Sequence, residues 1–357
     1  MIRLRAVLAL TAVGLVAVGC EEGTRPPQGA ETRSYSMGWA PNPPRFDPDL
    51  FFQVVDSVAT VSEAVIVQQP VPWPELFAGA SMDSLVEDRG GLVDYLRLQG
   101  LDEVVFLVDP LDGLDRRMED PGLVEAGRSI LEPEIRTIHE TWVREIAERT
   151  RAEWFGLASE INTLGTLGDP DLYAELVDLV NDLAPEVRAL SPGTRVFVSF
   201  QADEALGHVP GVPSQDELET IDDFDIDALG LSSYPVFFFE TPAAMPRDYF
   251  GAFRDVTNLP LIMVEGGWSS ESVPGLAATP QEQVEFFRRF EGFLDAVNAR
   301  LWVMLTFADL DIPALGLPPD RAETLSNFAF MGIVDTAMQR KPAFTEWVRI
   351  FERPLAR

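Results

Sequence analysis

The chain of 357 residues carries a formal net charge of −31, with 58 acidic and 27 basic side chains. Such a field repels nucleic acid and anionic lipid surfaces, which excludes both as partners, but it does not repel a neutral substrate. One lysine and two histidines leave almost no candidates for a lysine nucleophile or a histidine-rich metal site, so we expect no cofactor and no metal.

The first twenty residues are typical of an export signal. Arg3 and Arg5 precede an apolar run over 6–18, which is too short to cross a bilayer as a permanent helix. The stretch LVAVGC at 15–20 resembles a bacterial lipobox, in which the cysteine is acylated and becomes the new N-terminus. The resemblance implies a signal peptide over 1–19, a lipidated Cys20 and attachment to the periplasmic or outer face of the cell envelope. An ordinary cleaved signal with a coincidental cysteine is the alternative.

The remainder of the chain is interpreted as a short tether and one domain. Cys20 is the only cysteine, so no internal disulfide can form. Residues 20–32 are polar and rich in proline and glycine, as expected for a tether between membrane and domain. Residues 33–357 contain no internal linker or repeat, and their length is normal for one α/β barrel. We expect this domain to be a monomer.

Short β-rich segments recur along the domain, with helical patterns between them. Most of the segments are nearly continuous apolar runs, as expected for parallel strands covered on both faces. Alternating strands and helices predict right-handed parallel connections, so the sequence predicts a (β/α)8 TIM barrel. The main rival, a nucleotide-binding doubly wound sheet, would need a glycine-rich phosphate loop that the chain lacks. The predicted strands span 34–39, 64–68, 103–108, 154–158, 195–201, 228–232, 261–264 and 301–305.

Two of the intervening helices have clear start signals. Thr279-Pro280 with Glu282 is typical of an N-cap, a first-turn proline and a capping-box glutamate, and Asp169-Pro170 begins another helix. Apolar residues at helical spacing follow both starts and predict a face that packs on the barrel. The weakest unit is 215–221, before the sixth strand. Further helices are predicted over 48–58, 82–99, 132–150, 245–257 and 342–350.

A glutamate directly follows two of the predicted strands. Glu160 comes after the fourth strand and Glu265 after the seventh. In a barrel the chemistry lies where strands end, and burial there raises the pKa of a carboxyl group. Cleavage of a glycosidic bond needs one acid to protonate the leaving oxygen and one carboxylate to attack or stabilise the anomeric carbon. Either glutamate could instead cap a helix or pair with an arginine, but the two together predict a glycosidase.

This placement is similar to that in the retaining barrel glycoside hydrolases of clan A. The segment Leu231-Ser232-Ser233-Tyr234-Pro235, after the sixth strand, also looks like the one that supplies a tyrosine beside the nucleophile. The resemblance implies that Glu160 is the acid/base, Glu265 the nucleophile and Tyr234 the hydroxyl that orients Glu265. It implies double displacement on a β-linked poly- or oligosaccharide.

Two local features bear on this resemblance. Lys341-Pro342-Ala343 with Trp347, near the end of the chain, looks most like endo-β-1,4-galactanases and related secreted endoglycanases. The clan usually has an asparagine immediately before the acid/base, where its amide binds the sugar 2-hydroxyl, whereas this chain has Ser159. A serine is shorter and offers one donor. Either Asn162 or a water therefore compensates, or activity on ordinary pyranosides is weak.

Other side chains near the predicted strand ends are candidates for sugar contacts. Amides and carboxylates there can hydrogen-bond sugar hydroxyls, and aromatic walls can cover the C–H faces of sugar rings. A structural role explains each of them equally well. The substrate-binding candidates, besides Ser159 and Asn162, are Trp39, Gln68, Asp109, Gln201, Trp268 and Asp309.

Two other functions stay open at this point. A catalytically silent barrel that binds carbohydrate at the cell surface would also carry a lipid anchor, and the serine before Glu160 is compatible with it. A transporter's solute-binding lipoprotein would need two lobes and a hinge, and no boundary in the middle of the chain suggests them.

Overall fold

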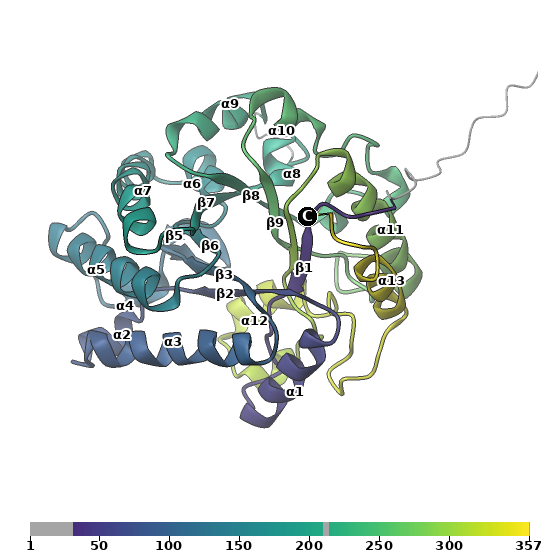
Figure 1. Cartoon of the computed structure of the whole chain (residues 1–357), viewed down its shortest axis with the longest axis horizontal. Coiled ribbons are helices and arrows are strands. Elements are labelled where there is room, and N and C mark those ends of the chain that lie inside the picture. Colours follow the sequence, from purple (N-terminus) through teal and green to yellow (C-terminus); the bar gives the residue numbers. More distant parts are fainter. Residues whose placement is uncertain (1–30, 210–213, 357) are drawn as a thin grey trace, which may run out of the picture.

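The barrel that the sequence predicts is present. The computed structural model describes residues 31–209 and 214–356, in which eight parallel strands close into a barrel in the order β1-β2-β3-β6-β7-β8-β9-β10 (Figure 1). The predicted strand ends differ from the observed ones by at most two residues. The barrel strands are β1 (Ser36–Trp39), β2 (Ala64–Gln69), β3 (Glu103–Val108), β6 (Trp154–Gly156), β7 (Arg195–Gln201), β8 (Ala228–Ser233), β9 (Leu261–Gly266) and β10 (Leu301–Met304).

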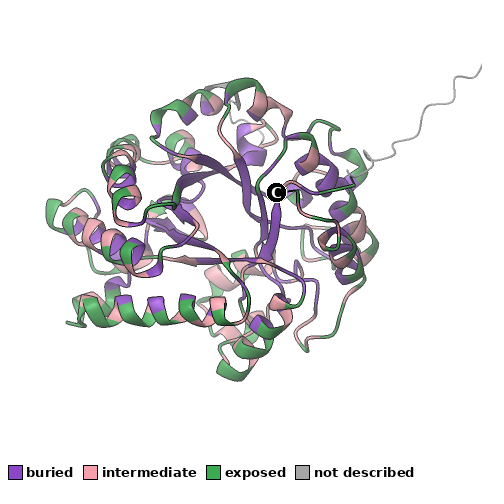
Figure 2. Ribbon diagram, in the orientation of Figure 1, coloured by how far each residue is buried: buried purple, intermediate pink, exposed green. Residues whose placement is uncertain are grey.

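Helices surround the barrel, with their buried faces toward the strands and their exposed faces outward (Figures 1 and 2). Three of them begin as their sequences require, because Asp47, Asp169 and Thr279 cap α1, α7 and α11 ahead of a proline in the first turn. The longer helices are α1 (Pro48–Ala59), α3 (Met82–Leu98), α5 (Pro133–Thr150), α7 (Pro170–Leu190), α11 (Pro280–Ala296) and α13 (Pro342–Phe351). No helix in the described ranges is long and apolar enough to cross a membrane.

Shorter elements fill the connections. The helix predicted over 245–257 is reduced to α10 (Gly251–Val256), because Pro246 holds Met245 in an extended conformation. The weak unit over 215–221 forms α9 (Ser214–Glu219) and a 3-10 turn. The other short helices are α2 (Trp73–Phe77), α4 (Pro121–Glu125), α6 (Ile161–Leu167), α8 (Ala202–Ala205) and α12 (Pro319–Ser326); the 3-10 turns are η1 (Thr220–Asp223), η2 (Pro235–Phe237), η3 (Pro242–Ala244) and η4 (Ile312–Leu315).

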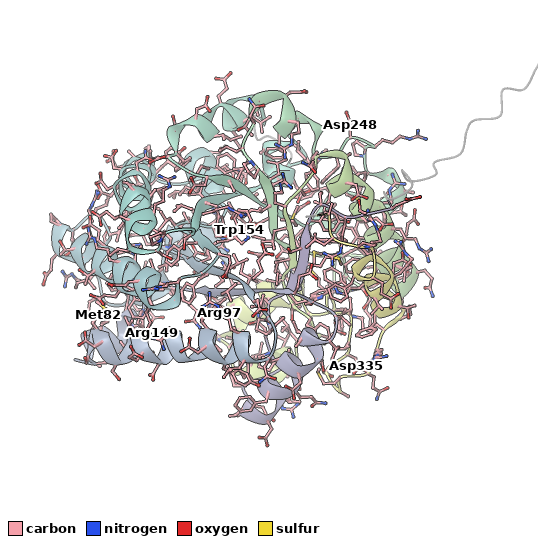
Figure 3. All side chains as sticks on the ribbon, viewed as in Figure 1. Met82, Arg97, Arg149, Trp154, Asp248 and Asp335 are labelled. Atoms are coloured by element: carbon pink, nitrogen blue, oxygen red, sulfur yellow. The ribbon has the colours of Figure 1, made fainter. Side chains whose placement is uncertain are left out.

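The core has two parts that follow the alternation of side chains along each strand. Alternate strand residues such as Ile66, Val105 and Ile262 form an inner cluster within the barrel, and their neighbours pack outward against the helices. Trp154 belongs to the inner cluster and lies well inside the molecule, whereas Asp335 lies at its edge (Figure 3). The indole Nε1 of Trp154 donates to the carboxylate of Glu103 over 2.8 Å.

The two ends of the described chain meet beneath the barrel. Arg33 forms a parallel bridge with Leu355, and its guanidinium donates to backbone carbonyls of Arg353 and Phe351 and to the carboxylate of Glu63. Arg33 precedes β1 and Glu63 precedes β2, so this contact lies at the N-terminal end of the strands, opposite the C-terminal ends where chemistry is expected. The predicted signal peptide over 1–19, the lipidated Cys20 and the tether up to residue 30 lie outside the described residues.

Candidate active site

Glu265 reaches the mouth of the barrel through a β-bulge. Along β9, Met263 packs outward and Val264 inward, so strict alternation would turn the next side chain outward again. The pairing with β8 instead skips one residue, since Leu231 faces Met263 and Ser232 faces Glu265. A bulge re-aims the side chain that follows it. It therefore brings the Glu265 carboxylate into the mouth.

Glu160 is held by a strained backbone at the end of the fourth barrel strand. Its φ of 48° lies in the left-handed region, which costs a residue with a side chain about 1 kcal/mol or more. This conformation joins β6 to α6, whose N-cap is Glu160, and the backbone N–H of Glu160 donates to the Ser199 hydroxyl over 3.0 Å. Such strain persists only where the surroundings enforce it, and it is common at functional sites.

The hydroxyl of Tyr234 donates to Oε1 of Glu265 over 2.5 Å. The ring is buried, and the backbone N–H of Tyr234 donates to the carboxylate of Asp203 over 2.6 Å. Asp203 is itself fully buried and also accepts from Ser233 and Tyr249. The tyrosine is thus fixed from behind, and its hydroxyl fixes one oxygen of Glu265.

Arg116 lies between the two glutamates. Its Nε is 3.0 Å from Oε2 of Glu160 and one terminal nitrogen is 3.8 Å from Oε2 of Glu265, while the other terminal nitrogen bonds the carboxylate of Asp109. Because a guanidinium is a small planar group, these two contacts place the glutamate oxygens no more than about 9 Å apart. Both carboxylates therefore lie within reach of one glycosidic bond.

Burial raises the pKa of both glutamates. For Glu265 the pKa rises to about 7, because burial and the charge of Glu160 disfavour ionisation more than Arg116 and Tyr234 favour it. Burial likewise raises the pKa of Glu160 against the opposing effect of the guanidinium. Burial also disfavours the charge of Arg116, but the carboxylates of Asp109, Glu160 and Glu265 raise its pKa above the ordinary value. A cation and an exchangeable proton therefore lie side by side at neutral pH, which general acid–base chemistry can use.

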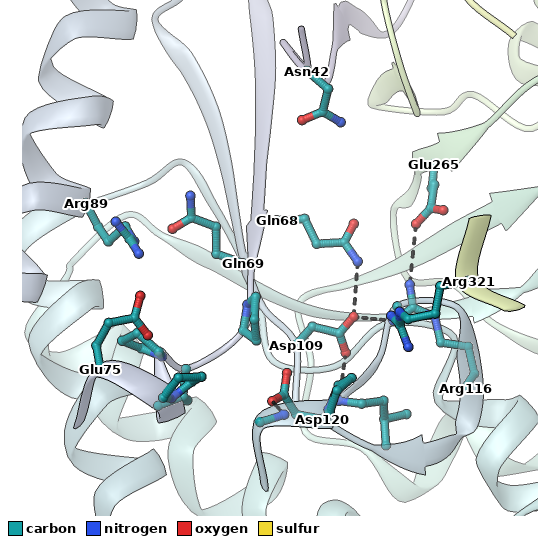
Figure 4. Close-up of a pocket in the computed structure, with 18 of the residues that line it drawn as sticks. Asn42, Gln68, Gln69, Glu75, Arg89, Asp109, Arg116, Asp120, Glu265 and Arg321 are labelled. Atoms are coloured by element: carbon teal, nitrogen blue, oxygen red, sulfur yellow. Dashed lines mark hydrogen bonds and ion pairs between the residues drawn. The ribbon is translucent and has the colours of Figure 1, made fainter. Parts of the chain in front are cut away.

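A cavity of about 550 Å³ opens beside this cluster (Figure 4). Arg116 and Glu265 form part of its wall, whereas Glu160 is not among the residues that line it. Since Arg116 contacts both the cavity and Glu160, a ligand would approach Glu160 past the guanidinium. A second hollow of about 200 Å³ adjoins the first and shares Asn42, Gln68, Gln69, Glu265 and Leu305 with it.

Two of the predicted sugar-binding residues, Gln68 and Asp109, line the larger cavity. Gln68 is the penultimate residue of β2 and donates to Asp109 over 3.1 Å, and Asp109 follows β3 and accepts from Arg116 (Figure 4). Both side chains are committed to the charge cluster in this structure. They can contact a ligand and also hold the guanidinium in place.

The other predicted polar residues are directed elsewhere. Ser159 is buried, and its hydroxyl lies 3.2 Å from that of Ser199. The side-chain amide of Asn162 donates to Glu217 and to the backbone of Gln201, so it does not replace the missing asparagine at the site. Gln201 caps α8, and Asp309 pairs with Lys341 over 2.7 Å. These contacts give the four side chains structural roles.

The two predicted tryptophans do not line the cavity. Trp39 ends β1 on the outward side and packs against Trp347 and Phe307. Trp268 is buried against Phe286 on α11. Both side chains point to the helices, so neither forms the flat sugar-binding wall that the sequence predicts at its position. Trp347, which the galactanase-like pattern included, is also buried and donates to the carbonyl of Val61.

Arg116 is the member of this charge cluster that the sequence interpretation missed. It lies on an antiparallel hairpin of β4 (Leu111–Asp112) and β5 (Asp115–Glu119), inserted after β3. The Asp112-Gly113 pair between short flanking segments is a hairpin signal that could have indicated this insertion. Nothing in the sequence shows that its arginine turns back toward the barrel mouth.

Solved glycoside hydrolases share this architecture. A GH5_18 enzyme from Streptomyces cattleya in complex with GlcNAc superposes with a TM-score of 0.67 at 17% identity, over 91% of this chain and 83% of that one. The chain has the fold of barrel glycosidases. A GH5_18 variant from Bifidobacterium longum with Manβ1-4GlcNAc gives 0.66 at 15% identity, over 91% and 80%, and the exo-β-1,4-mannosidase Op5Man5 from Opitutaceae bacterium strain TAV5 gives 0.63 at 15%, over 89% and 59%. No protein-family model matches the sequence, and no curated protein matches it significantly.

Proposed function

We propose that the protein is a retaining glycoside hydrolase that cleaves a β-linked glycan. The convergence of Glu160 and Glu265 on one guanidinium at the mouth of the barrel carries the hydrolase assignment, and the resemblance to the retaining clan A enzymes supports retention. Glu265 attacks the anomeric carbon and forms a glycosyl ester while Glu160 gives its proton to the leaving oxygen. Glu160 then takes a proton from water, which attacks the same carbon and releases Glu265.

Arg116 has to shift during this cycle. The first step needs a protonated Glu160 and an ionised Glu265. In this structure the guanidinium is nearer to Glu160, at 3.0 Å, than to Glu265, at 3.8 Å, which favours the opposite distribution of charge. A sugar that enters from the cavity has to move the guanidinium away from Glu160. That movement leaves Glu160 in a less charged environment, where it keeps its proton, and lets the cation stabilise Glu265.

The sugar and linkage are proposed only as a class. Among the known structures named above, one holds Manβ1-4GlcNAc and one is an exo-β-1,4-mannosidase, and the terminal sequence pattern resembles endo-β-1,4-galactanases. A cavity of about 550 Å³ suits a short oligosaccharide segment. We therefore propose a β-1,4-linked glycan as the substrate.

The test is a pair of substitutions, Glu160→Gln and Glu265→Gln, assayed on β-1,4-linked mannan, galactan and glucan oligosaccharides. Both variants are expected to lose at least a thousandfold in kcat/KM on any glycan that the wild type cleaves. Glu125→Gln, on an exposed side chain at the end of α4, is the matched control and should keep full activity. A folded wild type that cleaves no β-1,4-linked glycan, neutral or acidic, or full activity in either variant, would contradict the proposal.

A carbohydrate-binding barrel without activity is the second candidate. The observation that favours it is Arg116 itself, whose guanidinium joins both glutamates where a glycosidic bond would have to lie. Glycan binding that survives both glutamine substitutions, without products from the wild type, would support it. The solute-binding alternative has no support, because the described residues form one closed barrel with no second lobe.

We also propose that the protein is exported and held at the cell envelope by lipid on Cys20, and that it acts as a monomer. The lipobox-like stretch supports the first point. Metabolic labelling with radioactive palmitate tests it, because a Cys20→Ser variant should lose the label.

A further inference from the structure

Helix α3 carries an arginine on the side that faces the barrel. Val86, Gly90 and Val93 are buried along this side, and Arg89 lies three residues after the first and four before the last. Residues at this spacing share one face of a helix. The pattern would place an apolar side chain at position 89, but the chain has a guanidinium there that lines the cavity (Figure 4).

Arg89 has no partner among the described residues. Its Nε is shielded from solvent and makes no hydrogen bond, and no carboxylate lies within 4 Å of the guanidinium. The other two arginines of the cavity wall are both paired, Arg116 with Asp109 and Arg321 with both oxygens of Asp112. A shielded donor without an acceptor is costly, so an unpaired arginine in a cavity indicates an acceptor that comes from outside.

A second unpaired polar atom lines the same cavity. Oε1 of Gln69 is buried and accepts no hydrogen bond. Figure 4 shows Gln69, Arg89 and the exposed Glu75 on one side of the cavity and Glu265 on the other. On the side away from Glu265 the cavity thus offers a cationic donor, Arg89, and a neutral acceptor, Gln69, that have no partner in the described chain.

We propose that Arg89 and Gln69 form a subsite for a sugar with a ring carboxylate, so that the glycan is a uronate-containing one. A planar guanidinium binds a carboxylate through two parallel hydrogen bonds, which is stronger than its binding to a hydroxyl. A neighbouring sugar hydroxyl can donate to Gln69. This inference rests on the proposed function for the site of cleavage, but the binding that it predicts does not require cleavage.

The charge of the whole chain makes this subsite selective. A net charge of −31 repels polyanions at long range. A single carboxylate is retained only where a local cation compensates, and Arg116 and Arg321 are already neutralised by their partners. Added salt screens the long-range repulsion more than the shielded contact. Binding of an acidic oligosaccharide should therefore weaken little when salt rises, unlike binding to an exposed basic patch.

The test uses two matched pairs of tetrasaccharides that differ only in oxidation at C6: β-1,4-mannuronan against β-1,4-mannotetraose, and β-1,4-glucuronan against cellotetraose. Binding to the full chain with Glu265→Gln is measured by calorimetry, so that hydrolysis does not interfere. At least one acidic member should bind tenfold or more tightly than its neutral partner. Adding Arg89→Met should abolish the preference, Arg89→Lys should keep part of it, and Arg300→Met, on an exposed arginine lining a different hollow, should leave it unchanged.

Equal affinity for acidic and neutral members, or a preference that survives Arg89→Met, would overturn the subsite. If neutral chains are cleaved and Arg89→Met leaves kcat/KM unchanged on every substrate, the subsite is refuted while the hydrolase stands. If the acidic preference depends on Arg89 and nothing is cleaved, the hydrolase is refuted while the subsite stands. If Arg89→Met does not fold, the acidic preference of Arg89→Lys is the deciding measurement, because lysine keeps the charge and loses the second parallel hydrogen bond. A reduced preference supports the subsite, and an unchanged preference overturns it.

Discussion

Replacing Tyr234 by phenylalanine removes one hydroxyl from the centre of the site. That hydroxyl donates to Glu265 over 2.5 Å in a buried setting, and it lowers the pKa of Glu265. A hydrogen bond to a charged group contributes about 1.5–3 kcal/mol, so its loss from the transition state should reduce kcat/KM by about 10- to 150-fold. The variant keeps the aromatic ring, so we expect the fold to be unchanged.

The same substitution should change the pH profile in a defined direction. Without the donor, the carboxylate form of Glu265 is less stable, so its pKa rises further above about 7. The acid limb of the kcat/KM profile should move to higher pH, because Glu265 has to be ionised to attack. Profiles from pH 5 to 9 on a glycan that the wild type cleaves provide the assay, with Tyr173→Phe on α7 as the control. Unchanged activity together with an unchanged acid limb would refute the role given to Tyr234.

The remaining predictions concern charge. Arg116→Met should raise the pKa values of Glu160 and Glu265 and lower kcat more than tenfold; an unchanged pH profile in this variant would show that the guanidinium has no part in the cycle. Lys341→Met leaves Asp309 buried without its cation and should destabilise the protein by about 3 kcal/mol in urea unfolding; Arg117→Met, in an exposed pair, should cost less than about 1 kcal/mol, and equal effects would contradict this contrast. Burial raises the pKa of Glu204 to about 7, so the folded protein favours the protonated side chain. The stability that this protonation contributes is complete below pH 4 and is lost as pH rises through 7. Glu204→Gln should therefore flatten the fall in Tm between pH 5 and 8, and a steeper fall would show that the sign is wrong.

The barrel could be predicted from the sequence because its signals are local. Apolar runs of strand length and helix starts such as Asp169-Pro170 repeat along the chain, and each reports its own element. Glu160, Tyr234 and Glu265 were also accessible, since a barrel places the residue after each strand at the same end. Strand order alone therefore places these three residues at one end of the barrel.

The orientation of single side chains was harder to predict. Trp39 and Trp268 lie near strand ends but point to the helices, and the alternation that directs Trp39 outward depends on knowing which strand residue faces inward. At Glu265 a bulge overrides that alternation, and bulges leave little trace in sequence. The cation of the site comes from a hairpin whose path depends on tertiary contacts. These are the features that a pattern of residue types does not encode.

The central claim is that Glu265 forms a covalent bond to a sugar while Glu160 handles the proton. Incubation with an activated 2-deoxy-2-fluoro-β-glycoside of the cleaved sugar, followed by proteolysis and mass spectrometry, tests it directly, because the fluorine slows hydrolysis of the intermediate. The account predicts one sugar adduct on the peptide that contains Glu265, and its absence from Glu265→Gln. An adduct on another residue, or a substrate turned over with inversion of the anomeric centre, would contradict it.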